Sequence, residues 1–256
     1  MRLLVSMIAG LAMTTAVVAQ DKTASAGAAI ARALADPARA DQAGDDARRQ
    51  AAAVLAFSGV KPGDTVVDYL PGSGYWTRIF TNVVGPRGRV YALWPAAGAK
   101  YAEKNLPALN ARGLANVTAQ VQPTNLPSAS QPVDLFWTVQ NYHDIPNKGA
   151  GEPALRAFDA AVFKMLKSGG TYVVIDHADA PGTGLSGTET RHRIDPRRRP
   201  PPDRGDRLPL RRREQRSGQP GGRSYEERLR PGDPGQDRPV RDEVPQALIG
   251  GRFSRQ

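Results

Sequence analysis

The feature that most constrains the fold is a regular alternation of short apolar segments with longer amphipathic ones. Five segments have the length and composition of buried β-strands: residues 65–70, 89–93, 116–121, 133–139 and 171–176. Helix-like segments lie before and between them: residues 44–60, 75–84, 99–112 and 153–166. This alternation predicts an α/β fold with a Rossmann-like, doubly wound and mostly parallel sheet. Ligands in such sheets bind at the carboxyl ends of the strands, near the point where the strand order reverses.

A glycine turn follows the first predicted strand. Gly72-Ser73-Gly74 joins that strand to the next helix, and Asp68 lies four residues before Gly72. A turn without side chains lets the backbone approach a ligand, and the helix N-terminus offers N–H groups to it. The dinucleotide fingerprint has Gly or Ala three residues after its second glycine, whereas this chain has Thr77, which argues against NAD(P). A plain tight turn is the alternative interpretation.

These motifs together resemble a known enzyme family. The motif Asp68-x-x-x-Gly72-x-Gly74-x-x-Thr77, the five strands and the segment LKSGGTYVVIDH at residues 166–177 are similar to class I S-adenosylmethionine-dependent methyltransferases. More narrowly, the chain resembles predicted exported bacterial methyltransferases. Those proteins carry Pro-Gly-x-Gly-Tyr/Trp in the first motif, an Asn/Tyr-His pair after the fourth strand and a Val-Val-Asp/Glu-His end to the fifth. The resemblance covers residues 45–196 as one methyltransferase-like domain.

The resemblance implies a function and a set of site residues. The implied cofactor is S-adenosylmethionine, whose methyl group would be transferred to an unknown acceptor, a small molecule rather than nucleic acid. It implies that Asp68, Gly72 and Gly74 line the methionine end of the cofactor, and Pro71, Tyr75 and Trp94 are predicted to complete the cofactor-binding residues. The implied catalytic residues, beside the transferred methyl group, are Asn141, His143 and Asp144.

The chain also departs from the family's pattern. Leu70 stands where the common enzymes have glycine, and the second strand ends in Trp94-Pro95 rather than in an acid that holds the ribose. The third strand is followed by no acid either, because the polar side chains that follow it within residues 120–127 are amides and a hydroxyl, those of Gln122, Thr124 and Asn125. Trp94 could border the adenosine instead. A non-catalytic or vestigial exported binding module is the alternative function.

The chain has three histidines, His143, His177 and His192. After the fourth strand, His143 could deprotonate or orient an acceptor, or simply bond a loop carbonyl. Asp176, His177 and Asp179 follow the fifth strand and could form a small metal site with His143. Ordinary polarity at a sheet edge accounts for each of them, so the sequence predicts no metal.

The N-terminus has the pattern of an export signal. A positive start, an apolar run over residues 3–18 and small residues before Ala19 predict a signal peptide at residues 1–19 and a periplasmic protein. A membrane anchor is the alternative, although the run is short for a span. The absence of cysteine fits export without proving it. Residues 20–44 are Ala-rich and predict a loosely packed leader.

The C-terminal segment differs from the rest. Residues 1–190 hold 17 basic and 15 acidic side chains, whereas residues 191–256 hold 18 and 10, and all 18 are arginine. Residues 197–256 lack apolar periodicity, so disorder is expected. They could be an arginine-rich arm for nucleic acid, but the composition also fits GC-rich codons translated in a shifted frame. The sheet would then lack its last strands, leaving the fifth as an exposed edge in an unstable or inactive protein.

Overall fold

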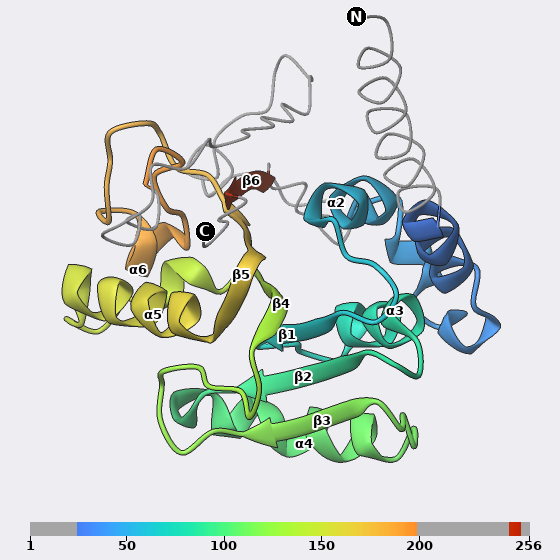
Figure 1. Ribbon diagram of the computed structural model, residues 1–256. Coiled ribbons are helices and arrows are strands. Elements are labelled where there is room, and N and C mark those ends of the chain that lie inside the picture. The colour runs from blue at the N-terminus through green and yellow to red at the C-terminus, as the bar shows by residue number, and fades with distance from the viewer. Residues whose placement is uncertain (1–24, 199–245, 252–256) are drawn as a thin grey trace, which may run out of the picture.

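A computed structural model of the chain describes residues 25–198 and the backbone of residues 246–251. Its centre is one sheet with the strand order β3-β2-β1-β4-β5-β6 (Figure 1). The strands are β1 (Thr65–Tyr69), β2 (Arg89–Trp94), β3 (Val117–Val121), β4 (Val133–Val139), β5 (Leu166–His177) and β6 (Gln246–Gly251). The first five are parallel, so the predicted Rossmann-like α/β fold is confirmed. The strand order reverses between β1 and β4.

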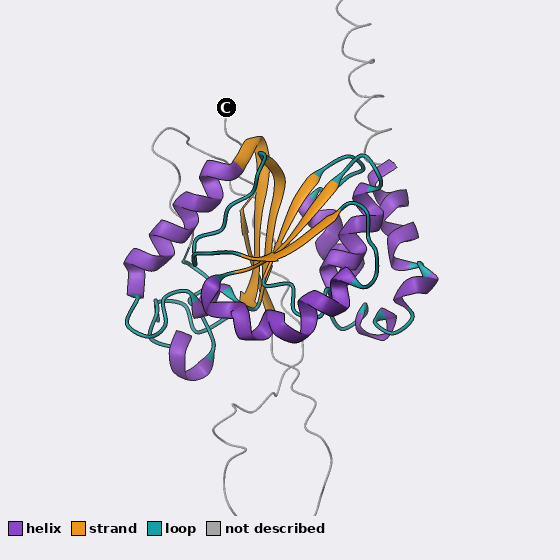
Figure 2. Ribbon diagram, turned by 90° about the horizontal axis from the view of Figure 1, so that it is seen from below, coloured by secondary structure: helices purple, strands orange, loops and turns teal. Residues whose placement is uncertain are grey.

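Helices cover both faces of the sheet, as Figure 2 shows. They are α2 (Ala51–Ser58), α3 (Tyr75–Val84), α4 (Ala99–Asn110), α5 (Gly151–Met165) and the short α6 (Thr188–Arg191). The side chains of successive residues in each buried strand point to opposite faces of the sheet. Val66 packs with α2 and α3, whereas Val67 packs with α5. Because both faces are covered, the central strands are apolar throughout, which is the pattern that the sequence showed.

Residues 25–34 form a helix that belongs to the main core. Ala29, Ile30 and Ala33 are buried in the same cluster as α2 and α3. The expectation of a loosely packed leader is therefore wrong for the part of residues 20–44 that the structure describes. Small alanines allow the helix to approach the core closely, and the sequence pattern understated that packing.

The strand β6 corrects the expectation of an exposed fifth strand. It pairs antiparallel with β5 over six residues, from His177 opposite Gln246 to Tyr172 opposite Gly251. Residues 1–24, including the predicted signal peptide, and residues 199–245 lie outside the described residues, as do residues 252–256. Within the part that is described, no helix is both long and apolar enough to span a membrane.

Candidate functional site

The glycine turn lies at the carboxyl end of β1, beside the point where the strand order reverses. Its backbone takes left-handed conformations at Leu70, Gly72 and Gly74, with φ of 55°, 56° and 82°. A Cβ added at Gly72 would meet no atom within 4 Å, so the space above this residue is open. Gly74 is the N-cap of α3 and provides no side-chain cap. The first N–H groups of α3 therefore have no side-chain partner at this cap and are available to a ligand oxygen.

Asp68 lies beneath the turn and is only 2% exposed. Its Oδ2 accepts a hydrogen bond of 2.6 Å from the hydroxyl of Thr77, one turn into α3. Burial raises the pKa of Asp68 to about 7, and the hydrogen bonds from Thr77 oppose that shift only in part. Thr77 belongs to the motif that the sequence showed, but its hydrogen bond to Asp68 could not be predicted from the spacing.

The side of the turn that faces β2 is filled by apolar side chains. Trp94 has no exposed surface and packs with Ala102 and Leu109 of α4. The expectation that Trp94 borders the adenosine is therefore not met, because an indole inside the core offers no face to a ligand. Leu70 packs against the same cluster. A Cβ added at Gly98 would lie 3.1 Å from Cδ2 of Leu70, so the two residues are in close contact. Pro71 is buried, and its carbonyl closes the turn by accepting from the Gly74 N–H.

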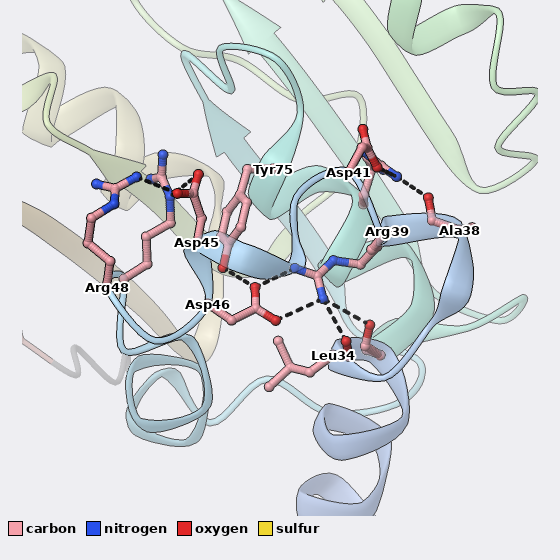
Figure 3. A network of polar contacts seen from close by, with 11 residues as sticks. Leu34, Ala38, Arg39, Asp41, Asp45, Asp46, Arg48 and Tyr75 are labelled. Atoms are coloured by element: carbon pink, nitrogen blue, oxygen red, sulfur yellow. Dashed lines mark hydrogen bonds and ion pairs between the residues drawn. The ribbon is translucent and has the colours of Figure 1, made fainter. Parts of the chain in front are cut away.

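Tyr75 joins α3 to the N-terminal segment rather than to the open side of the turn (Figure 3). Its hydroxyl donates to Oδ1 of Asp46 at 2.5 Å, and Arg39 pairs with the same carboxylate at 2.6 Å. The guanidinium of Arg49 lies 4.5 Å from the ring centroid of Tyr75. The buried Arg39 also donates to the carbonyl of Leu34. The hydroxyl of Tyr75 thus makes a structural contact, and the predicted cofactor contact of this residue stays a prediction.

Asn141 reaches the turn from the neighbouring strand β4. Its side-chain amide donates to the carbonyl of Val139 at 2.7 Å and lies 3.5 Å from the carbonyls of Tyr69 and Leu70. The amide thereby connects the carboxyl ends of β1 and β4. The structure thus brings Asn141 together with the turn, and its implied role beside the transferred methyl group stays a prediction.

His143 follows in the short 3-10 turn η4 (Tyr142–Asp144) and is anchored by Asp176 at the end of β5. Asp176 accepts from the His143 backbone N–H at 2.8 Å and lies 2.7 Å from Nδ1 of the ring. Burial disfavours the charged ring, but the hydrogen bond and charge of Asp176 outweigh it and raise the pKa of His143. The side chain is only 4% exposed, so His143 lies deeper than a residue on the rim.

The other polar residues that the sequence singled out after β4 and β5 do not all gather into one cluster with His143. Asp144 is half exposed, with its Oδ1 3.4 Å from Nε2 of His143. Asp179 pairs with Arg191 at 2.6 Å and does not join the histidines. Burial lowers the pKa of His177, and the charge of Asp176 offsets that shift only in part. The sequence suggested Asp176 as a metal ligand, whereas the structure uses it to orient His143.

Comparisons with solved structures found methyltransferases among the similar chains. No protein-family model matches the chain. A SAM-dependent methyltransferase from Aquifex aeolicus is 20% identical over 66% of this chain and 81% of that one, with a TM-score of 0.45. A DhpI-SAM-HEP complex is 21% identical over 63% and 68%, with a TM-score of 0.41. The glycopeptide N-methyltransferase MtfA complexed with sinefungin is 16% identical over 54% and 51%, with a TM-score of 0.40.

Many of the matching structures are thus methyltransferases, as the motifs predicted. The fold rests on the strand order and the parallel register of this chain itself. At the level of the fold, the chain resembles class I S-adenosylmethionine-dependent methyltransferases.

Proposed function

We propose that the chain binds S-adenosylmethionine at the carboxyl end of β1 and transfers its methyl group to an acceptor. One observation carries this proposal. A buried carboxylate, Asp68, lies under a bare left-handed turn that opens an uncapped helix, where the strand order reverses. That arrangement offers a carboxyl group, whose charged form a ligand ammonium would favour, beside N–H groups of the helix start, which suits a ligand with an ammonium and a carboxylate on one carbon.

The residues present fit the methionine end of the cofactor. The first N–H groups of α3 would receive its carboxylate, and Asp68 would balance its ammonium directly or through a water. Gly72 would leave room for the chain of the ligand, since the position of its missing Cβ is open. When bound, S-adenosylmethionine supplies an electrophilic methyl group. The protein then contributes chiefly by holding acceptor and methyl group in line.

The acceptor side would be formed by Asn141 and η4. Asn141 touches the turn itself, and His143 follows two residues later with its ring held by Asp176. Asp144, half exposed, presents a carboxylate at the mouth. These side chains would orient the acceptor. The near-neutral body of residues 1–190 favours a small-molecule acceptor over nucleic acid.

The filled side near β2 favours a second candidate, a binding module without catalysis. No carboxylate ends β2, and Trp94 and Leu70 occupy the space beside it. A nucleoside would lack a hydrogen-bonding partner for its ribose there. Such a module would bind a smaller amino acid-like ligand at the turn but not the adenosine.

Calorimetric titration of S-adenosylmethionine into the full chain tests both candidates. We expect binding that is weakened at least about tenfold by Asp68→Asn, corresponding to about 1.4 kcal/mol. Asp64→Asn is the matched control, because Asp64 is another buried acid of the same strand region but at the opposite end of β1. Equal binding by all three proteins would contradict the proposed site. Binding of methionine without S-adenosylmethionine would support the binding module.

We also propose export to the periplasm. The support is the sequence of residues 1–19, which has a positive start, an apolar run and small residues before Ala19. Cell fractionation followed by N-terminal sequencing checks this proposal. We expect a mature protein in the periplasmic fraction that begins at Gln20, and recovery of an uncleaved chain from the cytoplasm would contradict it.

A further inference from the structure

All three histidines of the chain lie together, although they are far apart in the sequence. The ring centroid of His143 is 5.4 Å from that of His192 and 6.0 Å from that of His177. They come from three different segments, η4, the end of α6 and the end of β5. The chain has no cysteine, so any imidazole or thiolate site for a metal ion must lie here. This convergence has no explanation in packing alone, since His192 is largely exposed.

We propose that His143, Asp144 and His192 form a binding site for a divalent transition metal ion, with Zn²⁺ as the best match. Nε2 of His143, a carboxylate oxygen of Asp144 and a ring nitrogen of His192 lie within 4.8 Å of one another. Two nitrogen ligands and one oxygen ligand are a set that zinc accepts, with a fourth position open for water or an acceptor. The proposal is independent of cofactor binding at the turn.

The distances are close to those of a tetrahedral site. Zinc bonds of about 2.0–2.1 Å place neighbouring ligand atoms about 3.3 Å apart. Oδ1 of Asp144 is already 3.4 Å from Nε2 of His143 and 3.6 Å from Nδ1 of His192. Only the separation of the two nitrogens has to shrink. His192 is 65% exposed at the end of a four-residue helix, so its side chain can make that movement.

His143 is oriented for ligation by a second residue. Asp176 is fully buried and lies 2.7 Å from Nδ1 of His143. Because a carboxylate accepts, Nδ1 carries the proton and Nε2 presents its lone pair to the cluster. A histidine held by a carboxylate in this way is the usual partner of a protein-bound metal. The neighbouring arginines are engaged elsewhere, Arg191 with Asp179 and Arg193 with the carbonyl of Ala178.

A metal ion at this site would change both the attachment of η4 and the chemistry open to His143. A metal ion would add a bond between η4 and the segment after α6, where Tyr142 and Ile194 already belong to one buried apolar cluster. The metal ion would also occupy the lone pair of Nε2 of His143. His143 therefore cannot bind the metal and accept a proton from the acceptor at the same time. With zinc bound, an acceptor in the open position would have its own pKa lowered by the ion.

Titration of Zn²⁺ into the untagged full chain, in the absence of S-adenosylmethionine, tests the proposal. We expect one zinc ion per chain and a visible absorption band with Co²⁺, whereas Mg²⁺ should not compete because it prefers oxygen ligands. His192→Asn should weaken zinc binding by more than the roughly 10–100-fold that loss of an outer partner costs. Asparagine suits the left-handed backbone of His192, whose φ is 51°, so this variant should fold.

Two further variants complete the test. Asp144→Asn removes the exposed carboxylate of the site and should also weaken zinc binding. Glu189→Gln removes an exposed acid of α6 outside the cluster and should leave the zinc affinity unchanged. Equal zinc affinity of the wild type and His192→Asn, or no stoichiometric zinc in the wild type, would overturn the proposal. Because the titration needs no cofactor, its failure is separate from failure of the proposed methyl transfer.

Discussion

At the scale of single residues, Asp68 carries the clearest pH dependence. Its pKa is about 7 in the folded protein and 3.8 in an ordinary environment, so the folded state binds its proton more tightly. The stability that this proton gives is fully present below about pH 4 and is lost as the pH rises through 7. The loss is on the order of 4 kcal/mol, at about 1.4 kcal/mol for each pKa unit.

Asp68→Asn should flatten this dependence. Its amide oxygen can still accept from Thr77, and its neutral group has no proton to lose. Urea unfolding at pH 5 and pH 8 checks the expectation that the stability difference between the two pH values shrinks in the variant. Burial also raises the pKa of Asp159 to about 7. Because Asp159 is present in both proteins, part of the pH dependence of the stability should remain in the variant. An unchanged pH dependence in Asp68→Asn would show that Asp68 does not titrate in this range.

The two turn glycines allow a matched pair of substitutions. Both have positive φ, so alanine at either position costs about 1–2 kcal/mol in the backbone. A Cβ at Gly72 meets nothing within 4 Å, whereas one at Gly74 would lie 3.0 Å from Cδ1 of Leu109. We therefore expect Gly74→Ala to lower the free energy of unfolding more than Gly72→Ala. Thermal or urea unfolding of both variants measures the difference, and equal losses would mean that Leu109 yields without cost.

At the scale of elements, Tyr75 ties α3 to the N-terminal segment. Tyr75→Phe removes a hydrogen bond to the charged Asp46 and should cost about 1.5–3 kcal/mol. Hydrogen exchange should then quicken in residues 25–46 while β1 and β4 remain protected. Tyr101→Phe is the control, because Tyr101 is an exposed tyrosine of α4. If both variants exchange alike, the contact with Asp46 does not hold the segment.

The elements also show how far the sequence could predict the structure. The bounds of α3 are predicted to the residue, because Gly74 and Gly85 stand at its two ends. The glycine turn, Asp68 and Asn141 are likewise found where their order along the chain implies. The position of Trp94 could not be predicted from the sequence. A side chain at the end of a strand can contact either a ligand or a neighbouring helix, and the packing between the sheet and its helices decides which. The meeting of His143 with His192 depends on contacts between distant segments, which no local pattern encodes.

At the scale of the whole molecule, the sheet depends on a strand near the end of the chain. The strand β6 covers β5 through backbone pairing over residues 172–177, and without it an apolar strand would become an edge. Of the residues after Arg198, the structure describes only the backbone of β6, and this strand pairs with the body through β5. Whether the protein is unstable, as the sequence predicted, therefore depends on how much β6 stabilises the sheet.

Removal of residues 246–256 should lower the melting temperature and promote association of the chain. Each unpaired group of β5 would meet solvent or another copy, and an exposed apolar edge is a template for pairing. Removal of residues 252–256 alone leaves β6 in place and is the matched control. Calorimetry and light scattering of both truncated proteins decide the matter. Should the shorter chain melt like the control and stay monomeric, β6 would contribute no stability, and β1 to β5 with their helices would suffice for the fold that holds Asp68 beneath its turn.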